Sequence, residues 1–280
     1  MENHACASVR KMNPQSSITA GYAAPRAWRP APLAGLSLLV HGAGGIALLA
    51  DPSTWLWVIA ILAANHLVLT VAVFFPRAQL LGSNVNCLPA AAASRREVSL
   101  TFDDGPDPKT TPRILELLDR HGAKASFFCV GEKACAHPEI VKDIARRGHS
   151  VENHSYHHSH AFACFGIARM GREIALAQEA LSGVTGRRPG FFRAPAGFRS
   201  PLLDFVLTRH GLRYVSWTRR GFDAVACDSQ RVLARLTDGL AAGDVLLLHD
   251  SRPLVLQILP VLLDELAARD LRSVSLPSVL

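Results

Sequence analysis

The chain has little charge and no closely paired cysteines, and these shortages exclude several classes of protein. Only 19% of its 280 residues are charged, and its six cysteines include no C-x-x-C pair. Their spacing and low density do not fit a disulfide scaffold. The net charge is +7, but the arginine pairs are scattered and have no aromatic ladder between them. The sequence therefore gives little support to nucleic-acid binding.

Charged residues are missing altogether from two long apolar runs near the N-terminus. Residues 30–50 contain no Asp, Glu, Lys or Arg, and neither do residues 54–76. Each run, at about 1.5 Å per helical residue, can cross a hydrocarbon core of about 30 Å. The alternatives are two buried core helices or a cleaved signal peptide. Soluble helices seldom lack charge for so long, and no A-x-A-like cleavage site follows the first run. We therefore predict a two-helix transmembrane hairpin over residues 30–76.

Basic residues flank this predicted hairpin and are absent from its turn. Those before and after it are Arg10, Lys11, Arg26, Arg29, Arg77, Arg95 and Arg96, whereas the turn at 51–53 has none. The positive-inside rule then places the turn outside and both chain ends in the cytoplasm. We predict a multi-pass protein of the cell membrane, with residues 1–29 as a disordered lead-in, residues 77–95 as a linker, and a cytoplasmic domain over residues 96–280.

From about residue 96 the pattern changes to short β-like runs that alternate with helical stretches. The predicted strands are Val98–Asp103, Ala125–Val130, Ser150–Asn153, Gly190–Arg193, Tyr214–Trp217 and Asp244–Leu248. Helices are predicted from Pro112, from Pro138 and after Pro201, each ending at a glycine, and near 254–269, where Pro260 should kink the helix or begin a new turn. This alternation predicts an α/β fold with a parallel sheet.

Chemically capable side chains gather where these strands end. They are Asp103 and Asp104, His154, Arg193, Asp223 in the loop after a strand, and His249. Because the carboxyl ends of parallel strands line the active-site face of barrels and open sheets, we expect these residues to share one rim.

The same residues fall in five short motifs that occur in a fixed order. The motifs are TFDDGPDP (101–108), HSYHH (154–158), RAPAG (193–197), WTRRGFD (217–223) and LLLH (246–249). One Asp-Asp-Gly-Pro alone would be a weak signal, but the ordered set resembles the five motifs of the polysaccharide deacetylases, the NodB-like carbohydrate esterases, over about residues 96–255. The resemblance implies a distorted (β/α) barrel with fewer than eight strands. It also implies a metal-dependent hydrolase that removes an N-acetyl or similar N-acyl group from an amino sugar.

A metal site is the first feature that the motifs imply. His154 and His158 are four residues apart, so on a helical turn they would project from one face. With Asp104 they form a two-histidine, one-carboxylate set that leaves open positions for catalysis. Zinc is the default metal, and such a site also accepts Co, Ni, Mn or Fe. The alternative is a surface histidine cluster; His157 and His160 are interpreted as neighbours rather than ligands.

The resemblance assigns the remaining roles. Asp103 would be the base, pointing the other way from Asp104, and His249 on the opposite side of the rim would be the acid. Arg193 would orient Asp103, and Asp223 would keep His249 protonated. For Arg193 and Asp223 the alternative is a structural ion pair.

Two departures from the family pattern concern the groove. Alanine stands at position 196, after the proline of the third motif, where an aromatic residue is usual, and Ala224 replaces the usual tryptophan after Asp223. Ala196 keeps the backbone N–H that helps to hold the oxyanion, but a long flat polymer such as chitin fits less well. We expect a glycan or a lipid-linked glycan beside the membrane. The alternatives are a periplasmic deacetylase of the opposite topology and a catalytically inactive carbohydrate-binding or scaffold protein on the same fold.

Overall fold

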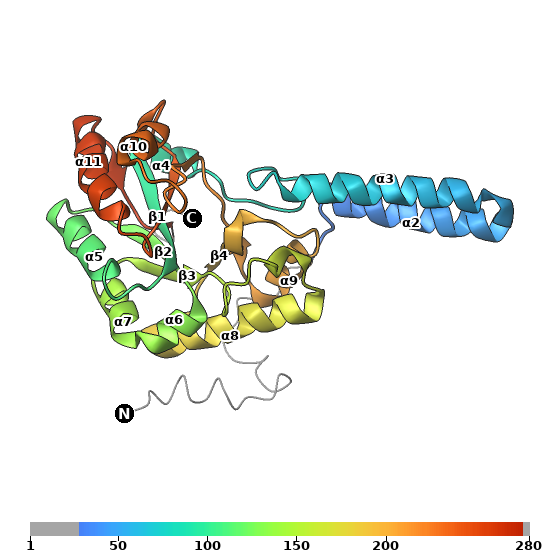
Figure 1. Cartoon of the computed structure of the whole chain (residues 1–280), viewed down its shortest axis with the longest axis horizontal. Helices are drawn as coiled ribbons and strands as arrows, with labels where there is room; N and C mark the ends of the chain where they lie inside the picture. The colour runs from blue at the N-terminus through green and yellow to red at the C-terminus, as the bar shows by residue number, and fades with distance from the viewer. Residues whose placement is uncertain (1–27, 277–280) are drawn as a thin grey trace.

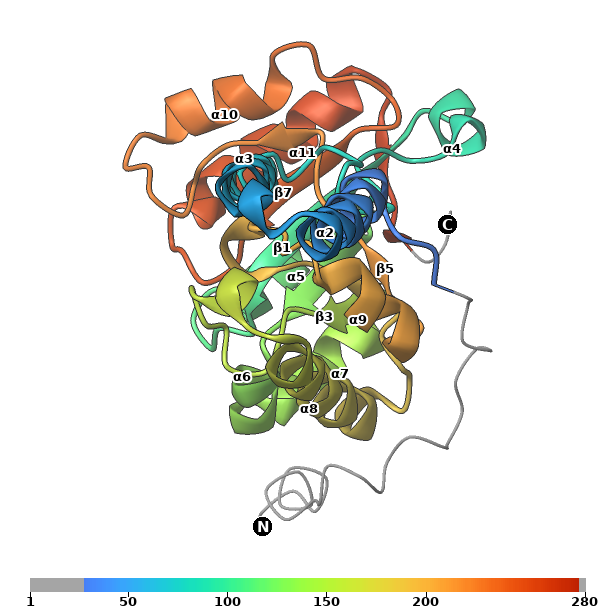
Figure 2. The ribbon, with the colours of Figure 1, turned by 90° about the vertical axis from the view of Figure 1, so that its right-hand side faces the viewer.

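The computed structural model describes residues 28–276, in which two long helices project from a curled α/β domain (Figure 1). The predicted lead-in over residues 1–29 therefore lies almost entirely outside the described residues. The two helices pack side by side and point away from the domain, toward the viewer in Figure 2. The active-site motifs all lie in the α/β domain.

The projecting helices are α2 (Pro32–Ala50) and α3 (Trp55–Val73), joined by the short 3₁₀ helix η1 (Pro52–Thr54). Both are long and apolar enough to cross a membrane, with mean hydropathies of 1.8 and 2.2, and 0% and 11% of their apolar windows is buried. Such exposure does not fit core helices of a soluble domain; it fits membrane spans or a signal sequence. The Nδ2 of Asn65 donates a hydrogen bond of 2.9 Å to the Oγ of Ser37 and links the two helices.

Parallel strands form the centre of the α/β domain. They are β1 (Glu97–Gly105), β2 (Ala125–Cys129), β3 (Ser150–Asn153), β4 (Phe191–Phe192), β5 (Arg213–Tyr214), β6 (Arg219–Arg220), β7 (Val245–His249) and β8 (Arg272–Ser273). Their order is β5-β4-β3-β2-β1-β7-β6, with β8 pairing β1 to one side. The described sheet is thus a curled half-barrel, in agreement with the expected distorted barrel. The short strands β6 and β8 were not predicted.

Most of the helices lie on the outer face of this sheet. The helices are α4 (Ala90–Ser94), α5 (Thr111–Arg120), α6 (Gly131–Ala136), α7 (Pro138–Arg146), α8 (Ile167–Thr185), α9 (Leu203–His210), α10 (Ser229–Thr237) and α11 (Val255–Ala268), with the 3₁₀ turns η2 (Phe162–Cys164) and η3 (Pro195–Gly197). The short α4 is an exception, because its Ala92 packs with Phe128, Val215 and Val245 of the concave side. The predicted helices after Pro112, Pro138 and Pro201 correspond to α5, α7 and α9. Pro260 lies inside α11, which continues through it.

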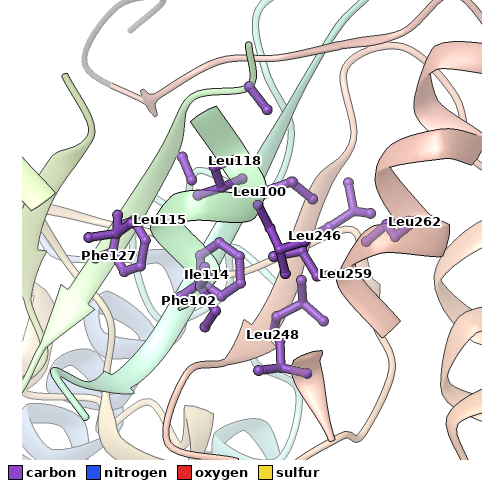
Figure 3. Packing of buried hydrophobic residues seen from close by; sticks show 14 of the residues in the cluster. Leu100, Phe102, Ile114, Leu115, Leu118, Phe127, Leu246, Leu248, Leu259 and Leu262 are labelled. Carbon is purple, nitrogen blue, oxygen red and sulfur yellow. The ribbon is translucent and has the colours of Figure 1, made fainter. Parts of the chain in front are cut away.

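The period-two pattern of β1 separates the core from the site. Val98, Leu100 and Phe102 are fully buried in the cluster that packs against α5 and α11 (Figure 3). Because successive side chains of a strand point to opposite faces, Thr101 and Asp103 lie on the concave face. The same alternation directs Leu246 and Leu248 of β7 into the core and turns His249 inward. The outer faces of the strands are therefore apolar, whereas the concave face carries the polar side chains around Asp103 and His249 and a smaller apolar cluster that includes Phe128 and Val245.

Residues 77–95 are not a free linker. Val85 bridges Val215, Cys87 bridges Asp244, and Leu88 is buried, with its N–H donating to the Gly243 carbonyl at 2.8 Å. The segment that leaves the hairpin is thus packed against the α/β domain and ties the two parts together.

Candidate active site

Asp103 and Asp104 both face the concave side of the sheet, which consecutive residues of a regular strand cannot do. Asp104 has a left-handed φ of 73°, and the pairing of β1 with β2 shifts register between Asp103 and Gly105. Such a bulge re-aims a side chain; Lys133 supports it by donating to the Asp104 carbonyl at 2.7 Å. Asp103 Oδ2 and Asp104 Oδ1 lie 3.8 Å and 3.3 Å from the Nε2 of His154. The expectation that the two carboxylates point apart is therefore wrong.

His154 and His158 are brought together by a loop and not by a helical turn. After β3 the chain is irregular over residues 154–158, and Ser155 and His158 have φ values of 63° and 52°. The Oγ of Ser155 accepts the N–H of His158 at 3.1 Å and closes the loop. Helical spacing predicted that the two histidines lie together, but left-handed residues in a loop, and not a helical turn, bring the two imidazoles close to one another.

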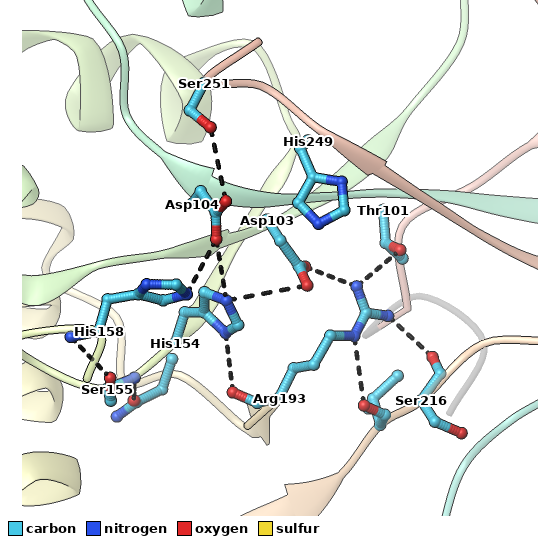
Figure 4. A network of polar contacts seen from close by, with 12 residues as sticks. Thr101, Asp103, Asp104, His154, Ser155, His158, Arg193, Ser216, His249 and Ser251 are labelled. Atoms are coloured by element: carbon cyan, nitrogen blue, oxygen red, sulfur yellow. Dashed lines mark hydrogen bonds and ion pairs between the residues drawn. The ribbon is translucent and has the colours of Figure 1, made fainter. Parts of the chain in front are cut away.

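The ligand atoms of Asp104, His154 and His158 all lie within 4.8 Å of one another (Figure 4). His154 uses Nδ1 to contact the Arg193 carbonyl at 2.8 Å, which turns Nε2 toward Asp104. The Nε2 of His158 is buried and makes no hydrogen bond with the described residues, although it lies 3.0 Å from the Oδ1 of Asp104. Two imidazole nitrogens and a carboxylate that converge without satisfying one another fit a divalent metal, and an oriented second nitrogen is typical of metal-binding histidine.

The neighbouring histidines stay outside this cluster. His157 turns away, and both its N–H and its Nδ1 contact Glu173, at 3.0 Å and 2.8 Å. The ring of His160 meets the ring of His158 edge to face, with centroids 5.7 Å apart. Their interpretation as neighbours agrees with this geometry, and Glu173 anchors the loop.

Asp103 is held by Arg193. The Nη1 of Arg193 lies 2.6 Å from the Oδ1 of Asp103 and also donates to Thr101 Oγ1 at 2.9 Å. Its Nη2 donates to the Ser216 carbonyl at 2.8 Å, and the guanidinium lies 4.2 Å from the centroid of the Phe128 ring. The arginine is fully buried, so its position, and that of Asp103, is fixed from several sides.

His249 stands beside Asp103, on the flank of β1 opposite to His154. Strands β1 and β7 pair Asp103 with His249, and Asp223 accepts both the N–H of His249, at 2.7 Å, and its Nδ1–H, at 2.9 Å. Burial lowers the pKa of His249, but the hydrogen bond and charge of Asp223, together with the charges of Asp103 and Asp104, outweigh it and raise the pKa above its ordinary value. Asp223 thus fixes the imidazole through Nδ1, and Nε2 lies on the opposite side of the ring.

One buried carboxyl near the site was missed at the sequence level. Asp250 has no exposed surface, accepts the hydroxyl of Thr111 at 2.7 Å, and leaves Oδ1 without a hydrogen-bond partner among the described residues. Its carboxyl fills the space that a side chain at Gly105 would need, since a Cβ there would lie 2.0 Å from Oδ2. Its place directly after His249 was the available signal.

Comparison with known proteins identifies the family. A chitooligosaccharide deacetylase of Azorhizobium caulinodans is 34% identical over 163 residues, which cover 57% of this chain and 76% of that protein. A peptidoglycan-N-acetylglucosamine deacetylase of Bacillus cereus is 33% identical over 193 residues, 66% of this chain and 69% of that protein. Residues 90–215 match the family model described as polysaccharide deacetylase. The chain belongs to the polysaccharide deacetylase family.

Solved structures of the polysaccharide deacetylase family share the fold. A peptidoglycan N-acetylglucosamine deacetylase in complex with 4-naphthalen-1-yl-N-oxidanyl-benzamide superimposes with a TM-score of 0.65 at 30% identity, covering 70% of this chain and 92% of that one. A family 4 carbohydrate esterase from Streptomyces lividans in complex with acetate gives 0.60 at 33% identity, covering 63% and 91%. The resemblance found in the sequence motifs is therefore confirmed.

Proposed function

We propose that the chain is a metal-dependent hydrolase that removes an N-acetyl, or similar N-acyl, group from an amino sugar. The observation that carries the proposal is the convergence of Asp104, His154 and His158 beside Asp103 and His249. The names of the relatives, which deacetylate chitooligosaccharides and peptidoglycan, support the amino-sugar substrate. A divalent ion such as zinc, held by the three ligands, would polarise the acyl carbonyl and make water a stronger nucleophile.

The remaining residues divide the proton transfers between them. Asp103, oriented by Arg193, would accept the proton of the attacking water, and His249, charged with the help of Asp223, would donate a proton to the departing nitrogen. Each such positioned group typically contributes about 10²–10⁴ in rate. The Ala196 N–H would donate to the carbonyl oxygen as negative charge develops there. Its left-handed φ of 56°, in the η3 turn, sets the direction of that turn.

We also propose that α2 and α3 span the membrane as a hairpin and hold the catalytic domain at its surface, on the cytoplasmic side. The exposure of both apolar helices and their polar link through Ser37 and Asn65 support a paired span. The basic residues on both sides and the acidic turn at Asp51 support the orientation. A lipid-linked glycan then suits the site better than an external wall polymer.

Acetate release tests the proposed reaction directly. The full chain, purified in detergent, is incubated with N-acetylated chitooligosaccharides and peptidoglycan fragments after removal of metal with a chelator, and Zn, Co, Ni, Mn or Fe is then restored. We expect acetate only after a divalent metal is restored. Full activity in the chelated protein, or no acetate with any metal and substrate, would contradict the proposal.

A further inference from the structure

A cavity of about 880 Å³ lies where the end of α3 meets the catalytic domain. Its lining comes from two segments far apart in the sequence, the end of the hairpin and the chain around β6, together with part of α10. The lining residues are Phe74, Phe75, Pro76, Arg77, Ala78, Trp217, Thr218, Arg219, Arg220, Phe222, Arg235 and Asp238. Four arginines and four aromatic side chains against a single acid make it a site for an anion.

The charge available to a ligand comes mainly from Arg220 and Arg235. Arg219 is engaged, because its Nε pairs with Asp244 at 2.7 Å. Arg220 is half-buried, with its guanidinium carbon 5.0 Å and 4.8 Å from the ring centroids of Trp217 and Phe222. Its Nε is buried and has no hydrogen-bond partner within residues 28–276. An arginine stacked in this way presents a rigid fork of donors, the geometry that matches phosphate oxygens.

The cavity adjoins the active site. Arg220 is the last residue of β6. Asp223, the partner of His249, follows three residues later in the next loop. Trp217, in the cavity wall, packs so closely on the η3 turn that a Cβ at Gly197 would lie 2.6 Å from its ring. A ligand that occupies the cavity is therefore next to the groups proposed to act on the amide.

The cavity also adjoins the surface of the proposed membrane. Phe74 and Phe75, at the end of α3, are 62% and 59% exposed, and Phe74 contacts Phe198 of the catalytic domain with ring centroids 5.4 Å apart. Residues just beyond the last turn of a helix that spans the hydrocarbon core lie at the level of the lipid headgroups. A phosphate in this cavity would thus be at the depth where a lipid carries its phosphate.

We propose that this cavity binds the phosphate of a lipid-linked amino sugar and so presents its N-acyl group to the active site. The inference rests on the proposed deacetylase function and on the proposed span. A soluble sugar phosphate has the same anionic group, but the exposed Phe74 and Phe75 beside the arginines offer an apolar surface that favours a lipid as the ligand. Arg220 and Arg235 bind the phosphate, and Phe74 and Phe75 face the chain that carries it.

The test compares three N-acetylglucosamine probes with the full chain in detergent micelles. They are polyprenyl diphosphate-linked N-acetylglucosamine, its octyl glycoside, which has no phosphate, and N-acetylglucosamine 1-phosphate, which has no lipid. Acetate release gives kcat/KM for the wild type, Arg220→Gln, Arg235→Gln and the control Arg231→Gln, whose side chain lies on α10, is 80% exposed and is paired with Asp228. We expect each cavity variant to reduce the preference for the diphosphate lipid by about tenfold or more, through KM, since each removes a charge-assisted hydrogen bond. The control should keep the preference.

Equilibrium binding of polyprenyl phosphate, measured by calorimetry in the same micelles, needs no turnover and separates the two ideas. One outcome is that the wild type binds the lipid more tightly than Arg220→Gln while no probe releases acetate. That result supports the phosphate site in the cavity and refutes the deacetylase proposal. Acetate release together with equal lipid binding in all four proteins overturns the proposal that the cavity binds the phosphate. Equal use of the soluble sugar phosphate and the lipid overturns the assignment of a lipid ligand.

Discussion

Arg193 and Asp103 meet at 2.6 Å inside the curled sheet, where the arginine side chain has no exposed surface and the aspartate side chain only 5%. They come from β1 and from the turn after β4, which lie three strands apart in the sheet. A buried pair of this kind is costly to break, because removal of one partner leaves the other charged and desolvated. The pair therefore fixes the geometry of the candidate base and also ties the two sides of the half-barrel together.

Asp103→Asn should leave the metal bound while reducing kcat by about 10²–10⁴, because an amide cannot accept the proton of water. Asparagine keeps an oxygen for Arg193, so the domain should remain folded. Metal content and acetate release, measured on the same preparation with a thermal unfolding curve, check the prediction. Wild-type turnover of this variant at every pH tested would mean that another group is the base.

Asp104→Ala and His154→Ala should each lose metal and activity together, since two ligands rarely hold a catalytic ion. Neither side chain belongs to an apolar core cluster of the described residues, and circular dichroism should show an unchanged fold. Asp264→Ala on the exposed side of α11 is the matched control and should keep both properties. Zinc at full occupancy in an active Asp104→Ala protein would refute the ligand assignment.

Asp223→Asn should shift the alkaline limb of the kcat profile to lower pH. The acid must be protonated to act, and the pKa of His249 is raised in the folded protein, so activity is lost as pH rises through that raised value. Replacement of the carboxylate by an amide removes the main group that raises it, and the loss should then begin at lower pH. Unchanged alkaline limbs in the variant and the wild type would exclude His249 as the acid.

Much of this arrangement could be read from the sequence because it depends on local patterns. The alternation of β1 and the proline and glycine positions at the ends of α5 and α7 placed the main elements. Ordered motifs then supplied the residues that the structure brings to one rim. The aim of individual side chains could not be read in this way, since Asp104 faces its partners only through a bulge and a left-handed φ, which depend on tertiary contacts such as that with Lys133.

The two-residue strands β6 and β8 were also beyond sequence reasoning. The equally short β4 and β5 lie in or beside apolar stretches of the sequence, whereas β6 consists of two arginines and β8 of Arg272 and Ser273. Neither β6 nor β8 shows a strand-like pattern, and the pairing of each is decided by its neighbour in the sheet. Asp250 was overlooked for a related reason. Its place directly after His249 puts it near the site, but the burial of its carboxyl depends on packing against Gly105, which the sequence does not show.

Asp250→Asn should make the stability of the protein less dependent on pH. Burial raises the pKa of Asp250 to about 7, whereas an aspartate in the unfolded chain ionises near 4. The unfolded state therefore loses its proton first, and the folded state becomes less stable as pH rises between these values, by about 2 to 4 kcal/mol. The drop in Tm between about pH 5 and about pH 8 should be smaller in Asp250→Asn than in the wild type. The surface variant Asp264→Asn should show the wild-type drop; an equal drop in all three proteins would argue against the assignment to Asp250.

The orientation of the hairpin can be decided with reporters. Both ends of the hairpin lie close together, since the N–H of Leu33, at the start of α2, donates to the carbonyl of Leu80, just beyond α3, at 3.2 Å. A paired span therefore returns the chain to the side from which it entered. A reporter fused after Leu280 should be active only in the cytoplasm, and one inserted at residues 51–53 only outside, because the basic residues lie on the domain side and Asp51 in the turn. A Leu280 fusion active only outside would place the domain beyond the membrane. The favoured substrate would then be an envelope polymer, whose N-acetyl groups are reached from that side, and the lipid-linked glycan would lose its support.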